Sequence, residues 1–465
     1  MSSSLNDQVD EYSSSYSSSL EDMSNSSNSS STHSSHSKSA SAESTYTTDD
    51  TEERNKIKEE EGKLKEISFF QHTLNLLNCM MGAGILSISS TFKDSGIIVS
   101  FIIMIAVAVI THFATVIVLT LQRETKAPGY DEMAKMILGK FGSYSLSAMI
   151  LILNTAGTLA YLVLCVDFIT SWFGFAKVDV SSSLYRAIIT FVYGLLIPIA
   201  LSIPRSLHFL SYLSSVSIFC IVFYMLMTFV KFGMAFHETK QISNSIELAK
   251  IDLSIFSSIS IYASAFSLPV AILPLMYQFT DNLKTRNRAT GTSLLITFLL
   301  SGVPALFGYL IFGSDTEGNV LNNYPDDDVI ITIVRVGFFL IVTMSYPLIQ
   351  RPISCSWSAI IFKQNNANEL TGWRRALVLC VSNGIPLIIA MFLPEMKPAL
   401  EVGGALGACL GNFTIPGAML LKHGAGTTFK KVMAGLLAAF GVIVAVIATY
   451  TAVISAIEVF KNVSL

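Results

Sequence analysis

"NLLNCMMGAGILSISS", residues 75–90, is apolar enough to lie in a lipid bilayer, yet it carries Gly82-Ala83-Gly84 at its centre. Glycine destabilises an ordinary helix by about 1 kcal/mol relative to alanine. Two asparagines, Asn75 and Asn78, stand just before the glycines. The stretch therefore predicts a membrane helix that is interrupted within the bilayer.

Composition points to a membrane protein throughout. Of the 465 residues, 51% are hydrophobic and only 14% are charged, and the mean hydropathy is +0.56. A soluble domain carries about 25% charged residues. The net charge of −3 provides no basic field for nucleic acid. The six cysteines lie in or beside apolar runs without a CxxC pair, so we interpret them as small buried side chains rather than as a disulfide framework or a metal site.

The first 65 residues have a different character. Residues 1–50 contain 21 serines, and such a polar stretch cannot bury enough apolar surface to fold, so the sequence predicts a disordered cytosolic tail over 1–65. The tail lacks the basic start and apolar core of a signal peptide. Its Ser and Thr residues beside acidic residues make kinases candidate partners. An inert tail is the alternative.

From residue 66 to residue 465, long apolar runs alternate with short polar joints, which predicts one transmembrane domain. A helix needs about 20 apolar residues to cross the hydrocarbon core, and the alternating pattern of a membrane barrel is absent. A short segment at 130–140 predicts an amphipathic helix at the membrane surface. The sequence predicts eleven transmembrane helices, at 69–91, 96–121, 146–173, 185–203, 207–234, 255–280, 289–313, 329–350, 373–393, 397–421 and 431–458.

Charge distribution orients these spans. With eleven spans, the joints that share a side with the N-terminus hold more Lys and Arg than those on the other side, and the other side collects acids such as Asp326-Asp327-Asp328. Positive charge in short loops marks the cytosolic side. The N-terminus is therefore expected in the cytosol and the C-terminus outside it.

A second interruption appears in the sixth span. Its sequence "SAFSLPVAILPLMYQF", residues 264–279, contains Pro269 and Pro274, and each proline removes a helix hydrogen bond. Two broken helices five spans apart are typical of a five-plus-five inverted repeat, with a binding site where the breaks meet. Alternatively, the glycines serve close helix packing and the prolines are simple kinks.

The motifs resemble those of the amino acid/auxin permease family, which includes sodium-coupled neutral and vacuolar amino acid transporters. Residues 78–86 are similar to its N-x-x-x-G-x-G-I-L opening, and "LFGYLIFGSDTEGNVLNNY" (306–324) is similar to its F-G-Y-L-x-F-G signature. "VTMSYPLIQRP" (342–352) agrees as well. The resemblance covers roughly residues 66–458. It implies a secondary active transporter of amino acids that works by alternating access. An amino acid sensor of the same fold, signalling through the tail, is the alternative.

One departure from the family pattern bears on coupling. Many members carry His-Pro-Glu in the sixth span shortly before Leu-Pro. Here Leu273-Pro274 is preceded by "SLPVAI", which contains neither His nor Glu. The coupling ion or the substrate range is therefore expected to differ from that of those members.

Candidate site residues lie at the two breaks. Backbone N–H groups of Gly82, Ala83 and Gly84 are expected to bind the substrate carboxylate, because small side chains allow a ligand to approach the backbone. Ser267 in the second break is a candidate substrate contact, with a hydrogen bond to its own helix as the alternative.

A sodium site is the second expectation. The resemblance implies a role for Asn78 at such a site, shared with Thr343 and Ser345 of the eighth span. For Asn78 an interhelical hydrogen bond is the alternative. Since an amide and a hydroxyl have no proton to exchange near neutral pH, the sequence favours sodium over a proton as the coupling ion, with the proton left open. No other metal and no cofactor are expected.

Four further polar residues lie in or near the apolar spans. Asp167 and Arg335 are costly inside a membrane, but both stand near helix ends, so contact with the membrane interface is favoured and an ion pair between them is left open. His112 and His208 are interpreted as packed or interfacial rather than titrating residues.

The chain contains no catalytic constellation and no glycine-rich ATP-binding loop, so an enzyme is not expected. Transport must then be driven by an ion gradient or by the gradient of the substrate itself. The bilayer and a small-molecule amino acid are the expected partners. The sequence leaves open whether the membrane is the plasma membrane or that of a vacuole or lysosome.

Overall fold

Helices are the only regular elements in the described part of the chain, which agrees with the predicted all-α membrane class. The computed structural model describes residues 67–180, 182–204, 213–239, 242–276, 279–364, 367 and 370–462. The expected tail at 1–65 and His208 lie outside these residues.

Nine helices among the described residues are long and apolar enough to cross a membrane. They are α5 (Ile97–Thr125), α7 (Lys140–Phe175), α8 (Ser183–Gly194) continued by η1 (Leu195–Ile199) and α9 (Ala200–Ser202), α10 (Leu213–Thr239), α13 (Leu283–Phe312), α14 (Val329–Phe362), α15 (Gly372–Phe392), α16 (Lys397–Val402) continued by η6 (Gly403–Thr414) and α17 (Ile415–His423), and α18 (Thr428–Asn462). Two interrupted helices add to these nine, so every expected span has a helical counterpart.

The interrupted helices are the first and the sixth, as the sequence predicts. The first consists of α3 (Phe69–Met80) and α4 (Gly84–Ser95), and the sixth of α11 (Ser254–Ala265) and α12 (Ile272–Leu275). Neither half reaches about 20 residues, so only the two halves together would be long enough to cross a bilayer, and the count of eleven spans stays a prediction. The amphipathic segment forms α6 (Tyr130–Leu138).

Helix boundaries differ from the predicted spans where a helix continues beyond its apolar core. The eighth span was predicted to end at residue 350, but α14 continues to Phe362. The predicted span ends before the charge of Arg351, whereas backbone hydrogen bonding continues through that residue. Gly96 separates α4 from α5 with a φ of +75°, and a side chain there would collide with the backbone of Ala249.

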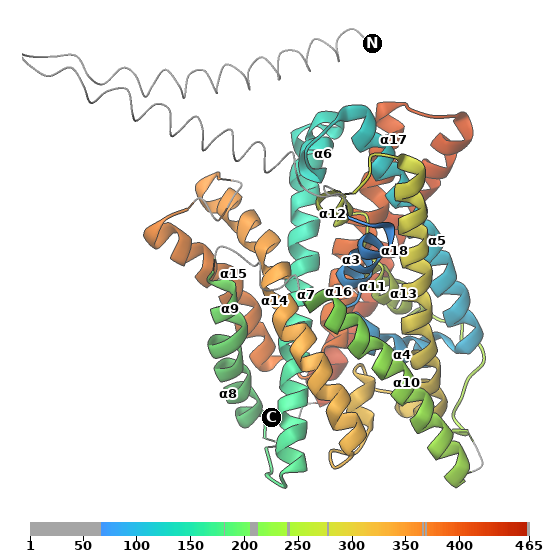
Figure 1. Ribbon diagram of the computed structural model, residues 1–465, viewed down its shortest axis with the longest axis vertical. Coiled ribbons are helices and arrows are strands. Elements are labelled where there is room, and N and C mark those ends of the chain that lie inside the picture. Colours follow the sequence, from blue (N-terminus) through green and yellow to red (C-terminus); the bar gives the residue numbers. More distant parts are fainter. Residues whose placement is uncertain are drawn as a thin grey trace, which may run out of the picture. The chain divides into compact units, whose positions relative to one another are not determined.

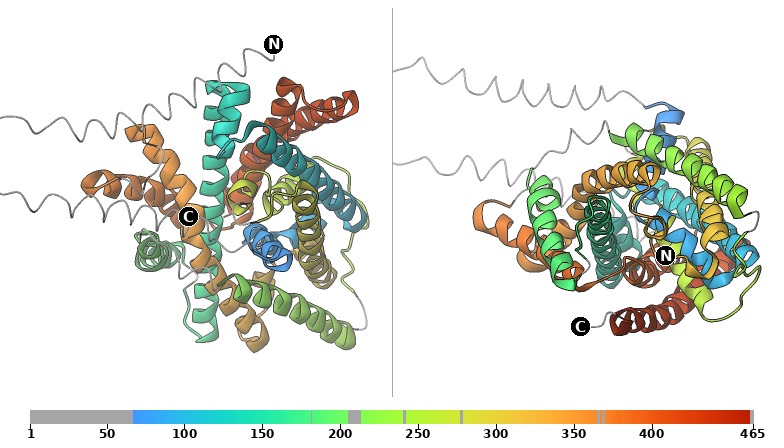
Figure 2. Two further views of the ribbon diagram at one scale, coloured as in Figure 1. Left: turned by 45° about the horizontal axis from the view of Figure 1, so that its top comes forward. Right: turned by 90° about the horizontal axis from the view of Figure 1, so that it is seen from below.

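Helix packing repeats itself between the two halves of the chain. In the first half α10 packs against α3 and α14; in the second half the corresponding α16 and η6 pack against α11 and α7. Likewise α3 contacts α13, and its counterpart α11 contacts α5. This exchange of partners is expected of two five-helix repeats related by a pseudo-two-fold axis. Figures 1 and 2 show α8 and α15 on the far side of α7 and α14 from the interrupted helices.

A run of glycines brings η6 close to its neighbours. A Cβ atom at Gly404 would lie 2.0 Å from the carbonyl oxygen of Ser260 in α11, and one at Gly403 would lie 2.4 Å from the Cβ of Ala156 in α7. Small residues at such contacts allow membrane helices to approach backbone to backbone. The tenth helix therefore supports both α11 and α7, the helices that surround the interruptions.

Candidate functional site

The first interruption begins where the helical hydrogen bonds of α3 end. Met81 still donates to the carbonyl oxygen of Leu77 at 2.9 Å, but its ψ of 86° turns the chain out of the helix. The Gly82 N–H donates to Met80 at 3.2 Å, and α4 starts at Gly84. The first N–H groups of a helix have no acceptor within that helix, and they attract anions. The segment therefore presents the N-terminus of α4 in the interior of the protein.

The two glycines of this segment face different neighbours. A Cβ atom at Gly82 would lie 2.4 Å from Tyr161 Oη in α7, and one at Gly84 would lie 3.5 Å from the Cβ of Ala265, the last residue of α11. Tyr161 and Ala265 are both buried. The start of α4 thus lies against the end of α11, and the two interruptions meet, with a phenol hydroxyl beside them.

The second interruption is held open by a side chain from the tenth helix. Asn412 of η6 is fully buried; its Oδ1 accepts from the Val270 N–H at 3.3 Å, and its Nδ2 donates to Ser267 Oγ at 2.8 Å and to the Ala263 carbonyl at 3.5 Å. Pro269 and Pro274 have no N–H to donate. Asn412 therefore compensates backbone groups that the unwound segment has lost from its helix. Ser267 bonds with this amide rather than being fixed by its own helix alone.

Replacing Asn412 by leucine should abolish uptake and destabilise the protein. Leucine has nearly the same volume but leaves the Val270 N–H without its acceptor, and an unpaired buried polar group costs about 1–3 kcal/mol. Asn383→Leu is the matched control. Asn383 is a buried amide that bonds Tyr346 and Leu379 in a scaffold helix. We expect Asn383→Leu to lose stability but keep uptake at equal membrane expression. Equal uptake in the two variants would show that the hydrogen bonds of Asn412 to the second interruption have no role in transport.

The candidate ion-binding residues lie on two different helices. Asn78 is on α3, one turn before the interruption, and its Oδ1 is buried. Thr343 is buried in α14, where its hydroxyl bonds Tyr193 Oη of α8 at 2.7 Å and lies 3.8 Å from Cys165 Sγ of α7. Ser345 is half-buried in α14. The hydroxyl of Thr343 thus joins scaffold helices, and no hydrogen bond found among the described residues joins it to Asn78.

Asp167 and Arg335 do not pair with each other. Asp167 binds Arg186 at 2.7 Å and accepts from Asn322, whereas Arg335 donates to the carbonyl oxygens of Leu321 and Tyr324 and pairs with Asp326 at 3.4 Å. Asp167 is 6% exposed and Arg335 is 1% exposed. The expectation that they reach the membrane interface is therefore wrong. Both side chains fix loops to the helices beneath them. His112, by contrast, is a half-buried residue that contacts Thr290, as expected.

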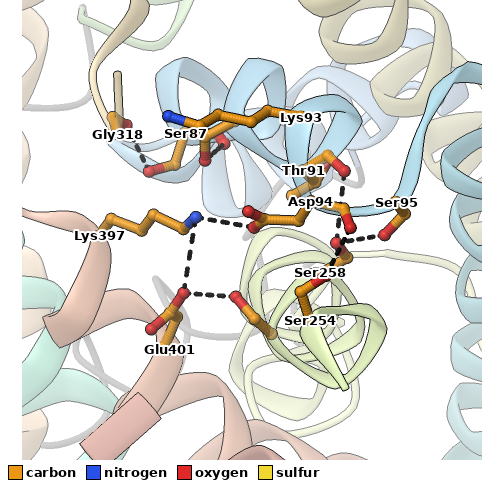
Figure 3. Close-up of polar contacts among 12 residues, drawn as sticks. Ser87, Thr91, Lys93, Asp94, Ser95, Ser254, Ser258, Gly318, Lys397 and Glu401 are labelled. Carbon is orange, nitrogen blue, oxygen red and sulfur yellow. Dashed lines mark hydrogen bonds and ion pairs between the residues drawn. The ribbon is translucent and has the colours of Figure 1, made fainter. Parts of the chain in front are cut away.

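A buried ionic cluster joins three helices around the interruptions, and the sequence reasoning missed it (Figure 3). Lys397 Nζ at the start of α16 lies 2.7 Å from Asp94 Oδ2 near the end of α4 and 3.8 Å from Glu401 Oε1. Ser257 of α11 also donates to Glu401. The cluster therefore fastens α4 and α11 to the tenth helix. The signal was present: Lys397 and Glu401 are spaced i, i+4, and Glu401 lies in an apolar span.

Comparisons with known proteins agree with this architecture. A family model described as transmembrane amino acid transporter protein matches residues 65–459. The chain is 26% identical over 389 residues to sodium-coupled neutral amino acid symporter 2 of Danio rerio, a match that covers 76% of this chain and 75% of the relative. Neither description supports the sensor alternative.

Two solved structures share the fold. One is a crystal structure of MhsT in complex with L-phenylalanine, with a TM-score of 0.53, 13% identity, and coverage of 83% of this chain and 99% of MhsT. The other is an Eremococcus coleocola manganese transporter, with a TM-score of 0.50, 13% identity, and coverage of 84% and 91%. At this identity the likeness concerns the fold alone.

Proposed function

This chain belongs to the family of transmembrane amino acid transporter proteins, and from that premise we propose that it moves a neutral amino acid together with sodium. Ion-coupled amino acid transport is the activity of the family, and the relative that suggests sodium is named as a sodium-coupled neutral amino acid symporter. The observation that carries the proposal is the meeting of two interrupted helices, with Gly84 facing Ala265 in the protein interior.

The substrate binds between the two interruptions in this proposal. Its carboxylate occupies the N-terminus of α4, where the N–H groups of Ala83 and Gly84 and the hydroxyl of Tyr161 can donate to it. Gly82 is the third backbone contact. Its N–H now donates to the carbonyl oxygen of Met80 and would donate to the carboxylate of the bound substrate instead. The ammonium group faces the carbonyl oxygens freed in the second interruption, beside Ser267. Because these contacts use only the groups that all amino acids share, side-chain preference must come from the surrounding walls.

Sodium binds near Asn78 in the same proposal, with oxygen from Thr343 and Ser345. A hydroxyl donates one hydrogen bond and keeps two lone pairs, so the bond between Thr343 and Tyr193 does not prevent the oxygen from coordinating an ion. Freed carbonyls at the end of α3 are the further ligands that such interrupted helices supply. None of these groups can carry a proton near neutral pH, which favours sodium over a proton.

Replacing sodium by choline at fixed pH and membrane potential should remove most uptake of radiolabelled alanine. Thr343→Ala should raise the sodium concentration needed for half-maximal uptake, because one coordinating oxygen is lost, and should leave the pH dependence unchanged. Thr449→Ala is the control, since that hydroxyl bonds only within α18. If uptake is undiminished in choline but falls when a proton gradient is collapsed, the coupling ion is a proton rather than sodium. Asn78 would then make only an ordinary interhelical hydrogen bond.

Cellular placement completes the proposal. The N-terminus faces the cytosol, and kinases act on the Ser and Thr residues of 1–65. The plasma membrane and a vacuolar or lysosomal membrane both fit a multi-pass transporter of this family. The excess of Lys and Arg in the joints on the N-terminal side supports this orientation.

A further inference from the structure

His72 is a fully buried imidazole on the first half of the first interrupted helix. It lies in the first turn of α3, is 0% exposed, and neither ring nitrogen has a hydrogen-bond partner among the described residues. Its ring stacks on Phe279 with a centroid distance of 3.9 Å and an interplanar angle of 10°. Leaving buried donors and acceptors unpaired is costly, so the protein retains this histidine at the expense of stability.

The stacked partner is itself fixed to the seventh helix. Phe279 follows α12, the second half of the sixth helix, and the next residues are clasped by Arg286 of α13. The Arg286 guanidinium donates to the carbonyl oxygen of Thr280 at 2.7 Å, to that of Phe279 at 3.4 Å, and to Asp281 Oδ1 at 2.7 Å. The ring stack therefore connects α3 to a segment that α13 holds in place.

The charge around His72 is positive on balance. Arg286 acts electrostatically on the ring, and its carboxylate partner Asp281 is fully exposed. The other helices packed against α3 are α10 and α12. The four residues of α12 are all apolar, and the described charged residues of α10 lie in its second half. A proton on the buried ring would thus add a second positive charge beside Arg286, and the described residues offer no acceptor for either N–H.

We propose that His72 is a proton-binding site that controls the inner half of the transport pathway, on the side of the membrane where α3 begins. The neutral ring stacks on Phe279 and keeps α3 packed against the segment after α12. When α3 moves away and water reaches the ring, the imidazole takes up a proton, and the charged ring cannot return to its buried position. Acid on that side therefore holds the pathway open. This inference rests on the proposed transport function and adds a regulatory site to it.

The expected change in the ratio of open to closed molecules follows from the titration of histidine. An imidazole in water has a pKa near 6.5, whereas a proton on the enclosed ring would have neither a hydrogen-bond acceptor nor a negative partner among the described residues. The closed form, in which His72 stacks on Phe279, is favoured above pH 6.5, and its population decreases as the pH falls. Between pH 7.5 and pH 6.0 the ratio of open to closed molecules should rise roughly fourfold, because only the open form binds the proton.

Thiol accessibility tests this without requiring transport. Leu76, one turn after His72 on the same face of α3, is 0% exposed, so we expect Leu76→Cys to react with a water-soluble maleimide only when α3 opens. The native thiol at Cys79 is removed by Cys79→Ser, and labelling of the purified protein is quantified on the peptide with the introduced cysteine. Labelling at pH 6.0 relative to pH 7.5 is then compared between His72 and His72→Phe, which keeps the ring stack but cannot titrate. The comparison at equal pH cancels the intrinsic pH dependence of the thiol.

We expect the ratio of labelling rates at pH 6.0 and pH 7.5 to be roughly fourfold higher with His72 than with phenylalanine. His423→Phe, which removes a half-buried histidine that pairs with Glu124 and lies outside α3, should behave as the unmodified protein. If His72→Phe does not insert, His72→Leu serves as the second variant. Equal ratios in all proteins would overturn the inference. A fourfold difference in a protein that transports no amino acid would leave His72 in place and overturn the proposed function instead.

Discussion

We expect Gly82→Ala to abolish uptake while the protein still reaches the membrane. The added methyl group would lie 2.4 Å from Tyr161 Oη and 3.3 Å from two ring carbons of the same residue. Tyr161 lies in a buried part of α7. Overpacking of this kind costs about 1–3 kcal/mol. Either the phenol or the unwound segment must shift, and in both cases the proposed carboxylate site changes shape. The measurement is initial uptake of radiolabelled alanine at equal surface expression.

Gly84→Ala is the matched control for this prediction. A methyl group there would lie 3.5 Å from the Cβ of Ala265, an ordinary van der Waals distance, so most uptake should remain. Leucine is too large for either space, and Gly82→Leu and Gly84→Leu are both expected to abolish uptake. Normal uptake by Gly82→Ala or by either leucine variant would mean that the glycines only serve helix packing and that the substrate binds elsewhere.

Lys397→Met should destabilise the protein by about 3 kcal/mol, because it leaves the buried Glu401 and the half-buried Asp94 without their shared cation. The side chains of Lys397, Asp94 and Glu401 are 16%, 13% and 1% exposed, respectively. Glu401 is too deeply buried for water to replace the ammonium group beside it. The measurement is the thermal unfolding of the purified protein in detergent, and uptake should fall as well, since the cluster connects both interrupted helices to α16.

An exposed ion pair in the same protein provides the comparison. Lys250 lies 3.5 Å from Asp252, and the two side chains are 40% and 46% exposed. Surface pairs of this kind contribute about 0–1 kcal/mol, so Lys250→Met should leave unfolding almost unchanged. Similar losses for the two methionine variants would contradict the assignment of the Lys397 cluster as a structural connection between helices.

Local sequence was sufficient to predict the helices and their interruptions. A run of about 20 apolar residues without the alternating pattern of a barrel forms a helix in lipid, because a single segment can satisfy its backbone hydrogen bonds there only within itself. Gly82 and Gly84 weaken a helix wherever they stand, and Pro269 and Pro274 break its hydrogen bonds regardless of neighbours. These are properties of a short stretch of chain, so the positions of α3–α4 and α11–α12 followed from the sequence, as did the family. The candidate site residues at the interruptions remain predictions that uptake measurements must test.

Tertiary structure alone decided which distant groups meet. Asp94 and Lys397 are 303 residues apart in the chain. The i, i+4 spacing indicates a pair between Lys397 and Glu401, but nothing in either segment indicates that Asp94 joins it. The local sequence does not predict the surroundings of Asn412 or His72 either. An amide or an imidazole occurs in the same sequence pattern whether it faces lipid, water or a broken helix. Burial is set by the packing of several helices together. It makes Asn412 a hydrogen-bond partner of the sixth helix and leaves the ring of His72 without a partner among the described residues. It also lets Lys397 connect three helices. The sequence by itself determined where the helices break; the fold decided what holds the breaks in place.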